Sequence, residues 1–373
     1  MTTEPHVHVK GPGKVSRRSF VESALLGAGV LSIGGIAGSV GVVVASDKAP
    51  SPGTAAPDGS AAVDHAQHGG VAQEPSAKLV HSAEDMDRMH REGLEAFMKN
   101  QTSPITAGKG NVPLASEVVD GVRVFRLSVD EVQWETEPGK KLSARGYNGM
   151  VPGPIIRATE GERVRIVVTN NLTESTSIHW HGLLVPNHMD GVAFVNQEPI
   201  KPGDKFTYEF TLRNSGTHMY HSHANSMDQV NRGLLGAFIV DPKDKASYPK
   251  YDREYIMVLN DLNLGFTING KSFPATEGIH ARLGERVLIR FLNEGIMNHP
   301  MHLHGMPMQI VAKDGWPLAQ PQMCDTIDVA PGNRYDAIVE ATESGTWVFH
   351  CHVLSHAEGP QGMFGLVTAM FVE

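Results

Sequence analysis

Residues 349 to 356, Phe-His-Cys-His-Val-Leu-Ser-His, combine one cysteine with three histidines in a short run near the C-terminus. Successive side chains of a β-strand point to opposite faces, so Cys351 would face one way and His350 and His352 the other. A thiolate with two imidazoles and a weak thioether is the ligand set of a blue copper site, and histidine pairs suit further copper ions. For this run taken alone, a zinc site or a buried strand with incidental histidines is the alternative.

An internal repeat extends this pattern over the chain. A Gly-Glu-Arg-Val segment begins at residue 161 and again at residue 284, and each is followed at the same distance by a His-x-His-Gly segment. A further His-x-His segment follows later in each copy. Such a repeat at matching positions indicates two homologous units. The four pairs are His179 and His181, His221 and His223, His302 and His304, and His350 and His352.

The two copies differ at the thiolate. The second copy has His299, Cys351 and His356, where the first has Thr176, Ser222 and Met227. A mononuclear thiolate site is therefore predicted only in the second copy. The eight paired histidines are too many for one ion and suit a cluster of three. Their second ring nitrogens need partners, so carbonyl and carboxylate oxygens are expected around them.

The elements that must position these side chains are β-strands. Residues 206–212 alternate apolar and polar side chains, and residues 164–168 and 287–292 are more fully apolar. Pro-Gly turn signals separate such runs. An all-β fold follows, with one domain over residues 110–243 and a second over residues 244–373.

Composition narrows the function further. The chain has 373 residues and a net charge of −9, and this acidic balance argues against nucleic acid as a partner. It has two cysteines, so a metal on Cys351 leaves no intrachain disulfide, and Cys324 is expected to be a small core residue.

The chain before residue 110 is expected to carry targeting rather than chemistry. Paired arginines at 17 and 18 precede an apolar run to about residue 45, which is typical of a twin-arginine export signal over residues 1–45. A membrane-spanning helix is the alternative, and whether the signal is cleaved or kept as an anchor stays open. Residues 46–109 are predicted to hold a disordered linker and then a short helix from Ser82 to about Asn100, with Met86, Met89, Leu94 and Phe97 on its packed face.

Together these motifs resemble the multicopper oxidases, specifically the two-domain, laccase-like bacterial group with the type 1 (blue) copper in domain 2. The resemblance covers residues 110 to 373. It implies two tandem cupredoxin-like Greek-key β-sandwich domains, each with half of the cluster ligands. It also implies about four coppers per chain (one type 1, one type 2 and a type 3 pair) and a homotrimer with its clusters between chains. Periplasmic, cell-surface or secreted location is expected.

The resemblance also implies a role for each ligand. His299, Cys351 and His356 would hold the type 1 copper, with Met363 as the weak axial ligand and Gln361 as the alternative. Asp190 resembles the family's acidic relay residue, although a turn residue before Gly191 explains it equally well. The type 2 ligands would be His179 and His302, and the type 3 ligands His181, His221, His223, His304, His350 and His352.

The implied reaction is oxidation of phenols or other one-electron donors at the type 1 copper, with reduction of dioxygen to water at the cluster. Electrons would enter through an exposed edge of His299 or His356 and pass from Cys351 to its histidine neighbours. Oxidation of Cu(I) or another metal ion is an alternative, suggested by Met297, Met301, Met306 and Met308. A copper nitrite reductase is disfavoured by Ser222, and an electron carrier leaves the eight paired histidines without a purpose.

Overall fold

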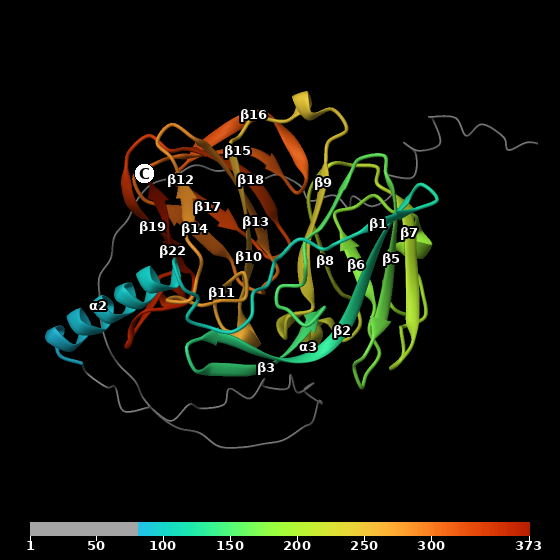
Figure 1. Ribbon diagram of the computed structural model, residues 1–373, viewed down its shortest axis with the longest axis horizontal. Coiled ribbons are helices and arrows are strands. Elements are labelled where there is room, and N and C mark those ends of the chain that lie inside the picture. Colours follow the sequence, from blue (N-terminus) through green and yellow to red (C-terminus); the bar gives the residue numbers. More distant parts are fainter. Residues whose placement is uncertain (1–80) are drawn as a thin grey trace, which may run out of the picture. The chain divides into compact units, whose positions relative to one another are not determined.

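The structure is a computed structural model that describes residues 81–373 (Figure 1). The predicted export signal and linker lie outside the described residues. Within the described part, no helix is long and apolar enough to cross a membrane.

The predicted N-terminal helix is α2, Ala83–Asn100, and Ser82 caps it by accepting a hydrogen bond from the Asp85 amide at 3.1 Å. Its buried face is anchored by Phe97, whose ring stacks on Phe273 and on Phe371, with centroids 5.4 and 6.0 Å apart. Leu94, predicted on that face, is instead 48% exposed. The face follows residues 86, 89, 93, 97 and 100, and Leu94 is one position beyond it.

The first half of the fold consists of two facing sheets. One has the order β1-β2-β5-β7 with β3 paired to β2, and the other has the order β4-β9-β8-β6. A core that includes Phe125, Ile166, Trp180 and Phe238 lies between them. The strands are β1 Glu117–Val119, β2 Val122–Glu137, β3 Lys140–Tyr147, β4 Ile156–Thr159, β5 Arg163–Asn170, β6 Ile178–His181, β7 Lys205–Thr211, β8 Gly216–Ser222 and β9 Leu235–Asp241, with helices η1 Asn187–Met189 and α3 Ser226–Asn231 between them.

The second half repeats this arrangement with sheets β11-β10-β13-β18-β15-β16 and β12-β22-β19-β14-β17. Parallel pairs recur at matching places, β2 with β5 and β10 with β13, then β4 with β9 and β12 with β22. The elements are η2 Lys245–Ser247, β10 Arg253–Asn260, η3 Leu262–Leu264, β11 Thr267–Ile268, β12 Ile279–Ala281, β13 Arg286–Asn293, β14 His299–Leu303, β15 Met308–Lys313, β16 Trp316–Cys324, β17 Thr326–Val329, β18 Arg334–Glu340, β19 Gly345–Cys351, η4 Leu354–His356, β20 Glu358–Gly359, β21 Gly362–Met363 and β22 Val367–Val372. The predicted all-β class is confirmed.

The two sandwiches pack directly on each other. Met219 and Leu235 of the first share an apolar cluster with Val258 and Leu292 of the second. Beside this cluster, the buried Arg290 donates hydrogen bonds to Asp336 at 2.8 Å and to Thr217 at 2.7 Å. Because Thr217 belongs to the first sandwich, this buried ion pair also ties the halves together.

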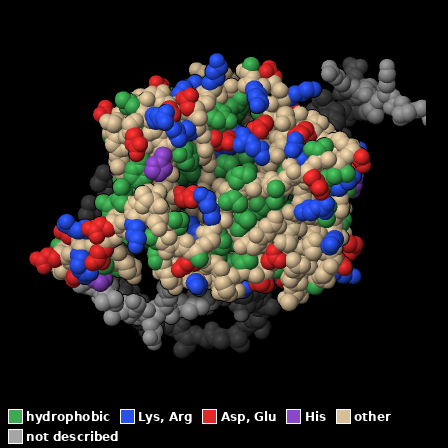
Figure 2. Space-filling model, viewed as in Figure 1, with side chains coloured by type: hydrophobic (Ala, Val, Ile, Leu, Met, Phe, Trp, Pro, Cys, Tyr) green, Lys and Arg blue, Asp and Glu red, His purple; other side chains and the backbone are tan. Residues whose placement is uncertain are grey.

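Charged side chains of both signs lie on one face of the molecule. On the face shown in Figure 2, acidic and basic side chains are interspersed between apolar ones rather than gathered into a patch of one sign.

Candidate functional site

The cysteine and two histidines of the predicted type 1 site converge in the second sandwich. Strands β14 and β19 pair so that Met301 is opposite Cys351, which places His299, two residues before Met301, on the same face as the thiol. His356 reaches this face from helix η4. The Cys351 Sγ atom lies 3.6 Å from His356 Nδ1 and 4.0 Å from His299 Nδ1. The three ligand atoms lie within 4.8 Å of one another, which fits a single small ion.

Asp261 fixes the orientation of His299. Its fully buried carboxylate is 2.9 Å from His299 Nε2 and accepts hydrogen bonds from the amides of Ile296 and Met297. Burial raises the pKa of Asp261, but these hydrogen bonds outweigh burial and hold the pKa below its usual value. With Nε2 engaged, Nδ1 faces Cys351. The exposed edge expected for His299 is therefore absent, because the ring is fully buried against Asp261.

Phe266 covers the other imidazole. Its ring stacks on His356 with centroids 4.2 Å apart and an interplanar angle of 21°. His356 is 6% exposed, so this ring is the one of the pair nearer to solvent. Asp261 and Phe266 lie on either side of the short helix η3. Neither was predicted as a residue of the site. They are far from the triad in sequence and match no spacing rule, so only the fold brings them there.

Burial shifts the pKa values of the Cys351 thiol and the His356 imidazole in opposite directions. Burial raises the pKa of the Cys351 thiol to about 11 and lowers the pKa of His356. Copper binding must therefore displace a proton from the thiol, whereas the imidazole is already in its ligating form.

The four histidines of the first sandwich lie on β6, at the end of β8 and directly after β8, with their rings in contact. His179 Nδ1 is held at 2.9 Å by the carbonyl of Asp190, and His221 Nδ1 at 3.0 Å by the carbonyl of Ser222. His181 Nδ1 is 3.3 Å from His221 Nε2. Burial, helped by the nearby Arg334 guanidinium, lowers the pKa of His181 to about 3. Burial likewise lowers the pKa of His221 to about 4, so the His181 and His221 rings are neutral at ordinary pH and able to bind metal.

The histidines of the second sandwich repeat this geometry. His302 Nδ1 is 3.0 Å from the Asp325 carbonyl and 3.0 Å from the Thr326 hydroxyl. His350 Nδ1 is 3.0 Å from the carbonyl of Cys351, while its Nε2 is 3.1 Å from His304 Nε2. Cys351 therefore directs its thiol into one site and its carbonyl to a ligand of the other.

The two histidine sets remain apart within one chain. Over residues 81–373, each ring contact between two of the eight paired histidines joins members of the same set of four. His223, His304 and His352 are exposed at the surface. Each sandwich therefore holds half of the predicted cluster ligands and has at least one of them at the surface.

Two carboxyl groups lie beside the first set. The Asp190 carboxylate is 3.5 Å from His179 Nδ1. Glu294, which was not predicted, lines a cavity of about 310 Å³ together with His181, His221 and His223. Glu294 is 6% exposed, its Oε1 atom has no hydrogen-bond partner, and burial raises its pKa well above the usual value. A buried carboxyl group with a raised pKa therefore lines the histidine cavity.

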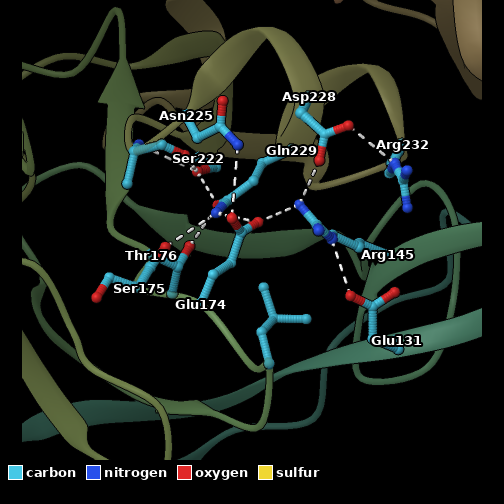
Figure 3. Close-up of polar contacts among 12 residues, drawn as sticks. Glu131, Arg145, Glu174, Ser175, Thr176, Ser222, Asn225, Asp228, Gln229 and Arg232 are labelled. Atoms are coloured by element: carbon cyan, nitrogen blue, oxygen red, sulfur yellow. Dashed lines mark hydrogen bonds and ion pairs between the residues drawn. The ribbon is translucent and has the colours of Figure 1, made fainter.

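In the first sandwich, the side-chain amide of Gln229 lies in the place that corresponds to the Cys351 site of the second sandwich (Figure 3). The buried hydroxyls of Thr176 and Ser222 both donate to Gln229 Oε1, at 2.9 and 2.6 Å. The Gln229 amide nitrogen donates to Glu174 at 2.9 Å, and Glu174 pairs with the buried Arg145. Met227, at the third matching position, is 69% exposed.

Met363 and Gln361, the two candidates for the axial ligand, lie on the short hairpin β20–β21. Gln361 is exposed at the turn. Met363 packs against the cluster of Phe97 and Phe273 under helix α2, and not in the core cluster that contains Cys351. In that core, the Cys351 amide donates a hydrogen bond to the Leu366 carbonyl at 2.9 Å.

Comparison with known proteins gives a consistent result. Models of the multicopper oxidases match residues 128–245 and 249–369. Among solved structures, the chain is similar to a blue copper oxidase from Nitrosomonas europaea (33% identity, TM-score 0.63, 67% of this chain and 86% of that chain). It is equally similar to the multicopper oxidase mgLAC (36% identity, TM-score 0.63, 68% of this chain and 86% of that chain).

Curated relatives are more distant and longer. Copper resistance protein A of Pseudomonas syringae pv. tomato is 28% identical over 66% of this chain and 50% of its own length. Laccase-1 of Cryptococcus neoformans var. grubii is 32% identical over 70% of this chain and 49% of its own length. The chain thus spans about half the length of the curated relatives it matches.

Proposed function

The chain belongs to the multicopper oxidase family, and on this premise we propose that it is a laccase-like oxidase of phenols and other one-electron donors. Dioxygen is the acceptor and is reduced to water. The observation that carries the proposal is the placement of Cys351, whose thiol lies in one candidate copper site while its two neighbours belong to another.

The proposed ligands follow the side-chain geometry. His299, Cys351 and His356 hold the type 1 copper, and the eight paired histidines hold the other ions, about four coppers per chain in all. Copper bound in this way supplies one-electron transfer and the binding and reduction of dioxygen. His179 and His302 are the type 2 ligands, and His181, His221, His223, His304, His350 and His352 are the type 3 ligands.

The protein's own part in electron transfer is a short covalent path. Cys351 is bonded directly to His350 and His352, and the His350 ring is also held by the Cys351 carbonyl. His356 is the imidazole through which a donor reaches the site, because His299 is sealed by Asp261.

Protons for water formation are proposed to pass through Asp190. Its carbonyl and carboxylate both lie within reach of the His179 ring. Glu294 is a second buried acid in the same cavity and can hold a proton close to His181 and His221.

Phenols are preferred to Cu(I) as donors on the basis of the methionines. Three of the four methionines, Met301, Met306 and Met308, are buried in the core of the second sandwich, where they cannot collect an ion from solvent, and only Met297 is half-buried. The burial of these methionines favours oxidation of phenols over oxidation of a metal ion.

A complete cluster needs a second copy of the chain. Each sandwich holds four of the paired histidines, with at least one of them exposed, and the two sets make no ring contact with each other over the described residues. We propose a homotrimer in which the first sandwich of one chain faces the second sandwich of its neighbour. Export by the twin-arginine route, to the periplasm, cell surface or medium, belongs to the same proposal.

The test is to load the full chain with copper and measure copper content, absorption and EPR spectra, and oxygen uptake with phenols and with Cu(I). An intense blue band, a type 2 EPR signal and phenol-dependent oxygen uptake are expected. Cys351→Ser should abolish the blue band and the uptake while the type 2 signal persists. A single blue copper without a type 2 signal would replace the oxidase with an electron carrier.

A further inference from the structure

Strand β16, Trp316–Cys324, is an uncharged strand at the edge of the second sandwich. Its sequence, Trp-Pro-Leu-Ala-Gln-Pro-Gln-Met-Cys, has no acidic or basic residue, and within residues 81–373 it pairs with β15 only. Leu318 and Cys324 pack against the core, whereas the other seven residues are exposed, including Trp316 at 56% and Met323 at 60%. Edge strands are usually protected by charged side chains. This uncharged edge is therefore a candidate contact surface.

The two ends of β16 adjoin the two histidine sets. At its first end, Trp316 lines a surface cavity of about 450 Å³ together with His181 of the first sandwich. At its other end, Asp325 directly follows the strand, and the Asp325 carbonyl is 3.0 Å from His302 Nδ1. Met323 is two residues before Asp325, and both are exposed. The strand thus has an exposed tryptophan beside one half of the predicted cluster ligands and an exposed methionine beside the other half.

The free edge of β16 is poorly suited to pairing with a further strand. Pro317 and Pro321 have no amide hydrogen, so the strand cannot offer a continuous row of backbone donors. Repeated strand addition would also leave an open edge each time and lead to fibres rather than to a closed assembly. The surface therefore suits a partner that docks through side chains.

We propose that β16 forms the contact between neighbouring copies of this chain, with Trp316 of one copy packed on Met323 of the partner subunit. The inference rests on the proposed function, in which the first sandwich of one chain meets the second sandwich of its neighbour. Joining the two histidine sets in this way brings the Trp316 end of one β16 toward the Met323 end of another, because each end adjoins one set. Such a head-to-tail contact uses two different surfaces and can close into a ring. A thioether against an aromatic ring is a favourable contact.

The test replaces the two side chains by opposite charges in the copper-loaded full chain. Trp316→Lys and Met323→Glu each place a charge against an apolar side chain at every junction. Each should weaken association by about 10-fold or more, so native mass spectrometry should find monomers at concentrations where the wild type is assembled. The type 2 EPR signal should fall with the assembly, whereas the blue band of the Cys351 site should persist. The double variant pairs the two charges at every junction and should regain part of the assembly.

Met98→Glu is the control, because Met98 is 45% exposed on α2, and this variant should assemble like the wild type. Normal assembly of both single variants overturns the β16 contact. Lack of recovery in the double variant overturns the pairing of Trp316 with Met323, and the oxidase proposal stands in either case. A monomeric wild type with a full type 2 signal would show a cluster within one chain and also overturns the contact. A wild type that binds no copper at the paired histidines overturns both the contact and the proposed function.

Discussion

At the scale of single residues, the candidate type 1 site depends on partners that do not touch the metal. Asp261 orients His299 by a hydrogen bond inside the core, and Phe266 covers His356 by stacking. Side chains of this kind commonly change metal affinity by about 10- to 100-fold when removed. The two residues therefore have separable effects, one on copper retention and one on access.

Asp261→Ala should weaken copper binding at the type 1 site by about 10-fold or more, because His299 loses the acceptor that sets its orientation. Asp261→Asn keeps an acceptor oxygen and should recover part of the affinity. Competition with a chelator, followed by the blue band, measures both. Equal affinity in Asp261→Ala and the wild type would show that core packing alone holds the ring.

Phe266→Ala should open a path to the His356 ring, which is now 6% exposed. We expect a higher kcat/KM for bulky phenols and a smaller change for compact donors. Phe364→Ala is the matched control, since Phe364 is near Phe266, with centroids 6.1 Å apart, but is not stacked on His356. A parallel change in both variants would point to general loosening of the loop.

Glu294→Gln should stabilise the protein at alkaline pH. Burial raises the pKa of Glu294, so the folded chain keeps a proton that the unfolded chain releases. That contribution is fully present below the pKa of the unfolded carboxyl group and is lost as pH rises through the folded value. In thermal unfolding of the copper-free protein, the melting temperature of Glu294→Gln should exceed that of the wild type near pH 8. The two melting temperatures should differ little near pH 4. Glu343→Gln, at an exposed position, is the control and should leave the profile unchanged.

At the scale of elements, β-strands and their spacing made much of the site predictable. Each paired histidine falls on or directly after a strand whose alternation and turns are visible in the sequence, and the repeat matches the two halves. The α2 helix was predictable from its Ser82 cap and apolar spacing. Contacts between distant segments were not, because no local pattern records that η3 brings Asp261 and Phe266 to the triad. The packing of Met363 against Phe97 and Phe273 under α2 was likewise beyond what motif spacing could predict.

Phe97 should be the main anchor of α2. Phe97→Ala removes a buried ring stacked on Phe273 and Phe371 and should cost about 3 kcal/mol of unfolding free energy. Leu94→Ala, on the exposed side of the same helix, should cost less than about 0.5 kcal/mol. Chemical denaturation of the two variants measures both values, and similar losses would mean that α2 packs less selectively than its burial indicates.

At the scale of the whole molecule, the separate histidine sets of the two sandwiches predict complementation between chains. A chain with His179→Ala and His181→Ala should be inactive, and so should a chain with His302→Ala and His304→Ala. Co-expressed, the two should regain part of the oxygen uptake, because some junctions combine an intact first sandwich with an intact second one. Mass measurement of the assembly accompanies the assay. Normal activity of either variant alone, or no recovery in mixed assemblies, contradicts a cluster shared between chains.

The amide at Gln229 has a consequence for the timing of catalysis. Hydrogen bonds from Thr176 and Ser222 hold this amide in the part of the first sandwich that corresponds to the Cys351 site. Each proposed cluster therefore receives electrons through one cysteine only. The four electrons needed to reduce one dioxygen must then pass one at a time through that cysteine. With copper bound there, turnover under limiting donor would be paced by the slowest of four successive electron deliveries through Cys351.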